Sequence, residues 1–282
     1  MSEEIIENDG KNLVKKKRRE RIVRKGRLKQ ERLRNFMRLI ICLGIISGVF
    51  YGSQNKGWYL NSDVFIKPDN NIVRIINNKI VSTDKIYAVL KNVEVPEKPI
   101  FVANTKQIKN GLMELAPVEN VYIRRFAFPA RLLIIVRERT PVITISPDEK
   151  IPPVASFTND GKLIGKEFMP LDKQYKTILV LTYGNKGDDY HKWDLKKVKE
   201  IQKIVRYVET YSKEKVEYID HRDPNNIFVK IQTVNIRLGK ADNNIYKRIE
   251  RIPSILPQVK LVESKIKYLD LGWDKVNYLK LQ

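Results

Sequence analysis

Residues 39–55 are seventeen consecutive residues without a charge, and this segment constrains the chain more than any other feature. A helix of that length is about 25 Å long, close to the ~30 Å hydrocarbon core of a bilayer. The preceding residues, 1–38, hold 14 Lys and Arg against six acids, which is +8 of the chain's net charge of +21. Because basic flanks stay on the cytoplasmic side, we predict one transmembrane helix with a cytoplasmic N-terminus and the bulk of the chain outside.

We expect the membrane-spanning segment to cover residues 39–60, because aromatic residues at 50, 51, 58 and 59 suit the membrane interface. No pair of small residues with cleavage-site spacing follows the apolar core, so we predict an uncleaved anchor. The single cysteine, Cys42, then lies in the membrane, and the exported part folds without disulfides. The side chains expected to span the membrane are Leu39, Ile40, Ile41, Leu43, Ile45, Ile46, Val49 and Phe50.

The basic tail admits three interpretations. It could bind nucleic acid through phosphates, lie along anionic inner-leaflet lipids, or hold a site for a cytoplasmic protein. The apolar segment that follows makes nucleic acid an unexpected partner, and the other two interpretations stay open.

The composition argues against an enzyme. One Cys and two His, His191 and His221, exclude a Cys-rich or His-rich metal site and leave few general bases. The polar cluster at 220–223 precedes Pro224 and is interpreted as turn chemistry, and His191 as a surface loop residue. We predict no catalytic residues, no metal and no cofactor.

Residues 71–141 alternate between strand and helix patterns. A strand at 72–76 is followed by a helix capped by Ser82 or Thr83, and by a second helix with Asn104 and Gln107 at capping-box spacing. Strand patterns follow at 118–125 and 131–137. The order strand–helix–helix–strand–strand predicts a small α+β module with two helices on one face of a sheet.

Residues 141–282 predict a strand-rich domain with two helices. Strands are expected at 141–146, 155–158, 216–220, 227–231, 234–238, 266–270 and 276–281, with helices after Asp194 and over 245–256. Asn159-Asp160-Gly161 is a hairpin turn signal. Residues 215–220 (KVEYID) recur as 265–270 (KIKYLD), which suggests a repeated helix–strand–turn–strand unit, although so short a match can also arise by chance.

Several motifs resemble those of the bacterial divisome family FtsQ, called DivIB in other lineages. The first is Arg125-x-x-x-Pro129-x-x-Leu132 followed by 136–142 (VRERTPV), with Phe128 and Ile143 where the family often has Trp and Ala. The others are 157–161 (FTNDG), 235–239 (NIRLG) with the helix after it, and 268–273 (YLDLGW), in which Gly272 replaces the family's arginine.

The resemblance implies an α+β protein with four parts: a basic cytoplasmic tail (1–38), a transmembrane helix (39–60), a POTRA domain of order β-α-α-β-β (61–140), and an FtsQ-type β domain with two helices (141–282). It implies a non-enzymatic, single-pass scaffold of the bacterial cytoplasmic membrane, located at the division septum. The implied partners are FtsB-like and FtsL-like proteins, with FtsK-like and FtsW- or penicillin-binding-protein-like proteins as further candidates.

The C-terminal strand is the expected partner-binding element, because an edge strand offers unpaired backbone groups to an incoming strand. The alternative is that this strand is internal and its aromatic side chains belong to the core. The residues assigned to partner binding are Trp273, Lys275, Val276, Asn277, Tyr278, Leu279, Lys280 and Leu281.

Three rival functions are weighed against this one. A secretion or envelope-assembly protein with POTRA repeats is the main alternative. Residues 141–282, however, lack the alternating pattern of roughly ten-residue segments that is typical of membrane β-strands. A membrane-anchored cell-wall enzyme lacks a recognisable nucleophile or metal motif, and a nucleic-acid-binding protein would depend on the tail alone.

Overall fold

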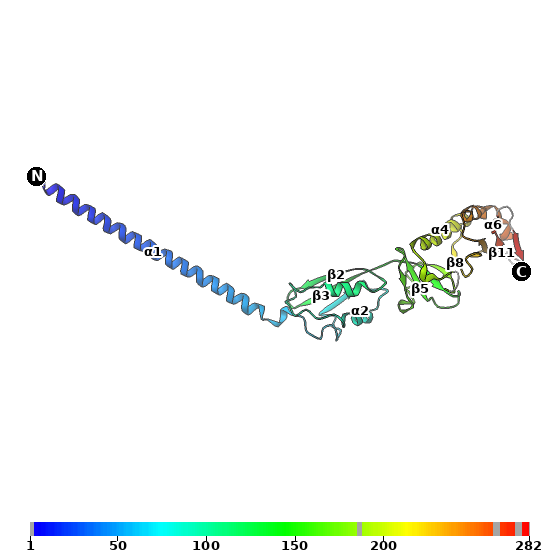
Figure 1. The fold of residues 1–282 in the computed structure, drawn as a ribbon, viewed down its shortest axis with the longest axis horizontal. Coiled ribbons are helices and arrows are strands. Elements are labelled where there is room, and N and C mark those ends of the chain that lie inside the picture. The colour runs from blue at the N-terminus through cyan, green and yellow to red at the C-terminus, as the bar shows by residue number, and fades with distance from the viewer. Residues whose placement is uncertain (1–2, 185–187, 262–265, 274–277, 282) are drawn as a thin grey trace.

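The structure is a computed structural model that describes residues 3–184, 188–261, 266–273 and 278–281. A long helix, α1 (Glu3–Ser53), leads into the first of two folded domains, and the N- and C-terminal ends lie at opposite ends of the molecule (Figure 1). The helix ends at Ser53, and a separate 3-10 turn, η1 (Lys56–Trp58), leads into the first domain. The helical part of the predicted 39–60 segment therefore stops before the interfacial aromatic residue Trp58.

The first domain has the predicted order: β1 (Val73–Ile76), α2 (Thr83–Leu90), α3 (Lys106–Met113), β2 (Val118–Phe126) and β3 (Arg131–Glu138). The sheet order is β1-β3-β2, with β1 parallel and β2 antiparallel to β3. Alternate strand residues such as Leu132 and Ile134 face the two helices and are buried with Ile86 and Leu112. One face of the sheet is thereby covered, as the strand and helix periodicities predict.

The caps of these two helices differ from one another. Ser82 caps α2, and its hydroxyl accepts the Lys85 N–H as predicted. The expected capping box at Asn104 does not form: α3 begins after Thr105 without a side-chain cap, and Asn104 instead accepts the Lys106 N–H at 3.0 Å. The loop closes locally on Asn104, which removes that side chain from the position that a capping box requires.

Within the described residues, the second domain contains a nine-stranded sheet of order β12-β11-β10-β9-β8-β7-β4-β5-β6. Its strands are β4 (Pro141–Ser146), β5 (Ala155–Thr158), β6 (Leu163–Ile164), β7 (Ile178–Leu181), β8 (Val216–Asp220), β9 (Ile227–Ile231), β10 (Asn235–Gly239), β11 (Ile266–Asp270) and β12 (Tyr278–Leu281). Strand β7 was not among the expected strands, and β6 was indicated only by the hairpin turn at 159–161. Short 3-10 turns, η2 (Lys166–Phe168) and η3 (Tyr190–Lys192), lie between β6 and the next helix.

The helix α4 (Leu195–Ser212) packs on this sheet, with Asp194 as its N-cap as predicted. Val198, Ile201 and Val208 are buried in the core beside the strand residues. The prediction of one helix over 245–256 was wrong, because the chain forms α5 (Ile245–Ile249) and α6 (Ile252–Leu261) with a break between them. The apolar residues keep one buried face, which hides the break from a periodicity argument.

Candidate protein-binding edge and membrane anchor

Strand β12 lies at one end of the nine-stranded sheet. It pairs antiparallel with β11, and no strand among the described residues pairs with its other side. At the opposite end, β6 has only two residues, and Ile164 of this strand is fully buried in the core of the first domain. The β6 end is thus covered by the molecule itself, and β12 is the open end.

The eight residues assigned to this edge are placed as follows. Trp273 is 61% exposed just before the strand, and Lys280 is exposed with its Nζ 5.7 Å from the centre of the Tyr268 ring. Leu279 is half-buried and packs against the domain's own core. Tyr278 and Leu281 are placed by their backbones at the two ends of β12, and Lys275, Val276 and Asn277 lie outside the described residues.

Two of the motifs meet beneath this edge. Strands β10 and β11 are parallel, and their register sets Arg237 opposite Asp270. The Arg237 Nη1 donates to Asp270 Oδ2 at 2.7 Å, and Asp270 Oδ1 accepts the Gly272 N–H at 2.8 Å. Because Asp270 is 6% exposed, this ion pair is partly withdrawn from water and joins β11 to β10, on the side of β11 away from β12.

The segment that follows β11 is held from the helical side. The Arg251 Nη2, at the break between α5 and α6, donates to the carbonyls of Leu271 and Trp273, both at 2.8 Å. The left-handed backbone of Gly239, with φ of 74°, brings that residue against Gly272. A Cβ at Gly239 would lie 3.3 Å from the Gly272 Cα, so glycine permits this close approach.

The repeat suggested by residues 215–220 and 265–270 appears in the element order. The first copy is α4, β8 and β9, and the second is α6, β11 and β12. In each copy, the strand after the helix pairs parallel with the strand before the helix, β7 with β8 and β10 with β11. The position outside β9 is filled by β10, whereas the equivalent position outside β12 is open among the described residues.

The residues assigned to the membrane lie on α1. Helix α1 is, among the described residues, the one helix long and apolar enough to cross a membrane, and the segment that qualifies is Arg24–Ser53. All eight assigned residues are large exposed hydrophobics, and all of them except Ile40 are more than half exposed. Exposed apolar residues on every side of a helix are expected for a helix in lipid.

The VRERTPV motif lies at the junction of the two domains. The Glu138 carboxylate accepts the backbone N–H groups of Lys79, Ile80 and Val81 at 2.8–2.9 Å, just before the α2 cap. Arg139 pairs with Asp160 in the β5–β6 hairpin. The consecutive motif residues Glu138 and Arg139 thus bind a loop of the first domain and the β5–β6 turn of the second domain, respectively.

Electrostatics support the second of these contacts. Burial raises the pKa of Asp160, but the Thr158 hydroxyl and the Arg139 guanidinium outweigh it and hold that pKa below the ordinary value. The carboxylate is therefore charged at neutral pH and remains a partner for Arg139. Near the same junction, Phe168 is buried in the core of the first domain, and Lys85 Nζ lies 4.1 Å above its ring.

The interpretation of His221 as ordinary turn chemistry was incomplete. His221 is 1% exposed, and its Nδ1 lies 2.8 Å from Asp188 Oδ2, while Trp193 Nε1 donates to Asp188 Oδ1 at 3.1 Å. The neighbouring Arg222 pairs with Asp220, and that hydrogen bond raises the pKa of Arg222. The contacts of Asp188 join the connection between β7 and α4 to the end of β8. No local sequence pattern indicates a contact between residues as far apart as Asp188 and His221.

Comparison with known proteins bears on the first domain. Residues 71–139 match the family model described as a POTRA domain of the FtsQ type. The matched range covers β1 to β3 and ends at Arg139, next to the motif residue Glu138. No curated protein matches the chain at a significant level.

An apolar N-terminal helix followed by an FtsQ-type POTRA domain is consistent with a membrane-anchored division protein. The domain is of the FtsQ type, and this match supports the assignment of the chain to the FtsQ/DivIB family of cell-division proteins.

Proposed function

We propose that this protein is a non-enzymatic scaffold of the bacterial divisome, anchored by α1 with its N-terminus in the cytoplasm and its two domains outside. In this proposal it links early and late division proteins during septum formation. It binds FtsB-like and FtsL-like partners through the second domain, while the POTRA domain contributes to recruitment.

The observation that carries this proposal is the open edge of β12. An incoming strand would satisfy the outward N–H and C=O groups of residues 278–281, with which no strand among the described residues pairs. The exposed Trp273 ring, which follows β11, offers an apolar anchor of the kind that contributes most at protein interfaces. The repeat adds the orientation: β10 runs antiparallel to β9, so we expect the partner strand to run antiparallel to β12.

A pair of proline substitutions tests the edge directly. Consecutive residues of a strand direct their N–H groups to opposite sides, and proline removes the N–H. One of Leu279→Pro and Lys280→Pro should therefore weaken pairing with β11, and the other should remove an outward donor. We expect the variant that loses the outward N–H to abolish co-purification of the FtsB-like partner while leaving the melting temperature nearly unchanged.

Two further variants complete this experiment. Tyr278→Asp places a charge on the edge and should abolish capture, whereas Leu261→Asp, a matched control at an 85% exposed position, should not. Capture that persists in all three strand variants would contradict binding at this edge.

The cellular role is tested by an N-terminal fluorescent fusion in dividing cells. A band at mid-cell during constriction, with a division defect on depletion, is the expected result. A uniform membrane signal without a division defect would contradict the proposal and favour a role in secretion or envelope assembly.

A further inference from the structure

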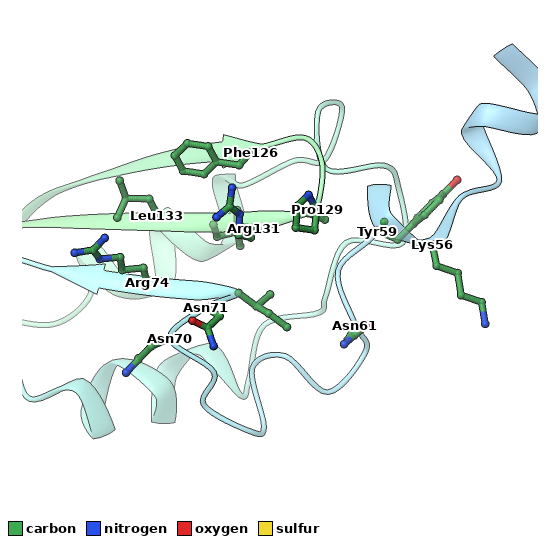
Figure 2. A pocket seen from close by; sticks show the side chains of 14 residues that line it. Lys56, Tyr59, Asn61, Asn70, Asn71, Arg74, Phe126, Pro129, Arg131 and Leu133 are labelled. Atoms are coloured by element: carbon green, nitrogen blue, oxygen red, sulfur yellow. The ribbon is translucent and has the colours of Figure 1, made fainter. Parts of the chain in front are cut away.

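A cavity of about 590 Å³ opens in the POTRA domain next to the end of α1. Figure 2 shows that its walls come from the segment 56–61, the beginning of β1 and the β2–β3 turn. A volume of this size is typical of sites for small molecules and head groups. It is separate from the β12 edge, which lies in the other domain.

The charged residues that line this cavity are all basic: Lys56, Arg74 and Arg131. Across the part of the chain that the structure describes, none of the three forms an ion pair with a carboxylate. The Arg131 guanidinium lies 5.3 Å from the centre of the Phe126 ring. The cavity therefore combines uncompensated positive charge with the apolar surface of Phe126 and the amide groups of neighbouring asparagines.

The acidic residue nearest in sequence to the cavity wall is not itself a lining residue. Asp69 directly precedes the lining residues Asn70 and Asn71, and its Oδ1 accepts the Asn71 N–H at 2.8 Å. This hydrogen bond commits the carboxylate to its own turn. An anion entering the cavity would thus meet hydrogen-bond donors and cations.

Hydrogen bonds hold the cavity at the end of the apolar helix. Trp58 Nε1 donates to the Gly52 carbonyl at 2.8 Å, and the Tyr59 hydroxyl donates to the Ser53 carbonyl at 3.1 Å. The uncharged segment ends at residue 55, and Lys56 is already a lining residue. Since the head-group layer is roughly 5–8 Å thick on each side of the hydrocarbon core, the cavity mouth would lie at the height of lipid phosphates when the uncharged segment spans that core.

An exposed aromatic cluster lies at the same level. The Trp58 ring contacts Phe101 and Phe128, with ring centres 5.8 and 5.2 Å apart, and these two phenylalanines are 54% and 59% exposed. Val102 beside them is 56% exposed. Exposed apolar clusters are unfavourable in water, but aromatic residues at this height are favoured in a membrane interface.

We propose that this cavity binds the head group of an anionic phospholipid, while the cluster of Trp58, Phe101 and Phe128 enters the outer part of the acyl layer. The POTRA domain would then be seated on the membrane surface at a fixed height. The inference rests on the proposed membrane anchoring by α1, but not on the division partners.

Hydrogen exchange of the full chain in lipid nanodiscs tests this site. The nanodiscs contain phosphatidylcholine alone or with increasing fractions of phosphatidylglycerol, and the readout is the exchange of amides in 56–61 and 126–131. We expect these amides to become protected as phosphatidylglycerol increases. In Arg74→Gln/Arg131→Gln, the affinity for this lipid should fall by roughly 30-fold, at about fivefold for each lost cation.

A matched control keeps the net charge of that variant. Lys196→Gln/Lys199→Gln removes two exposed cations from α4 in the other domain, and it should show the wild-type response. Equal protection in the two lipid compositions, or an unchanged response of the arginine variant, would overturn the proposal. So would protection in phosphatidylcholine nanodiscs on addition of a soluble glycerol-phosphate oligomer, because the occupant would then be a polymer and not a membrane lipid.

Failure of the anchor is distinguishable in the same experiment. A chain that does not co-elute with nanodiscs contradicts the membrane anchoring itself and, with it, this inference. A chain that co-elutes but shows no lipid-dependent protection contradicts only the head-group site.

Discussion

The contact between Glu138 and the loop before α2 should control the stability of the POTRA domain. The carboxylate accepts three backbone N–H groups, those of Lys79, Ile80 and Val81, at 2.8–2.9 Å. A net contribution of about 1 kcal/mol for each bond gives about 3 kcal/mol for Glu138→Ala. Glu138→Gln keeps one acceptor oxygen and should cost about half of that.

A loss of this size is large for a domain of some 70 residues. It should lower the melting temperature of the POTRA transition by more than about 10 °C. The three amides should also exchange about 100-fold faster, because 1.4 kcal/mol corresponds to a factor of ten. Thermal unfolding of the full chain in detergent, with hydrogen exchange at 79–81, measures both quantities.

The matched control is Glu119→Ala on the neighbouring strand. Glu119 pairs with Arg137 at 2.9 Å, but the two side chains are 43% and 62% exposed, so the loss should stay below about 1 kcal/mol. If Glu138→Ala melts within about 2 °C of Glu119→Ala, Glu138 does not stabilise the loop and the reasoning is wrong.

Three further perturbations follow from the contacts described above. Asp270→Asn weakens the ion pair with Arg237 and should cost about 2 kcal/mol and reduce capture of the β12 partner, measured by denaturant unfolding and co-purification. Burial raises the pKa of Glu214, but its hydrogen bonds have the larger effect and hold the pKa below the ordinary value of 4.5. The ionised carboxylate therefore stabilises the fold above pH 4.5, and this stabilisation is lost as the pH falls through the pKa of the folded state. The melting difference between wild type and Glu214→Gln should therefore shrink from pH 7 to pH 3. Gly57→Ala would drive its Cβ into the Phe128 ring. Because that ring is 59% exposed and can move aside, the cost should be only about 1 kcal/mol, measured by melting of the POTRA transition.

Each of these has a control of the same chemistry. Asp223→Asn changes a carboxylate in an exposed turn, and Glu217→Gln an exposed strand residue, so both should behave as wild type. Gly52→Ala has open space around the new Cβ and should be neutral. If a control loses as much stability as the test variant with which it is paired, the contact proposed for that test variant is not the cause of its effect.

Local signals in the sequence determined much of this protein. The uncharged segment after a basic run indicates a membrane helix, the Ser82 cap and the stripe on residues 198–208 predict α2 and α4, and the Asn-Asp-Gly turn predicts the β5–β6 hairpin. These features depend on side chains within a few residues of one another, so composition and spacing are sufficient to predict them. The motif residues also indicated the FtsQ-type domain, which the family comparison supports.

Tertiary structure alone decided how these pieces meet. The strand order that leaves β12 open, the burial of His221 against Asp188, and the Glu138 contact with residues 79–81 all join segments tens of residues apart. Such contacts depend on the packing of whole sheets and helices, which sets hydrogen-bond partners that no local pattern encodes. The basic cavity belongs to this group as well, since Lys56, Arg74 and Arg131 line one cavity only when β1 pairs with β3 and the chain returns to the end of α1.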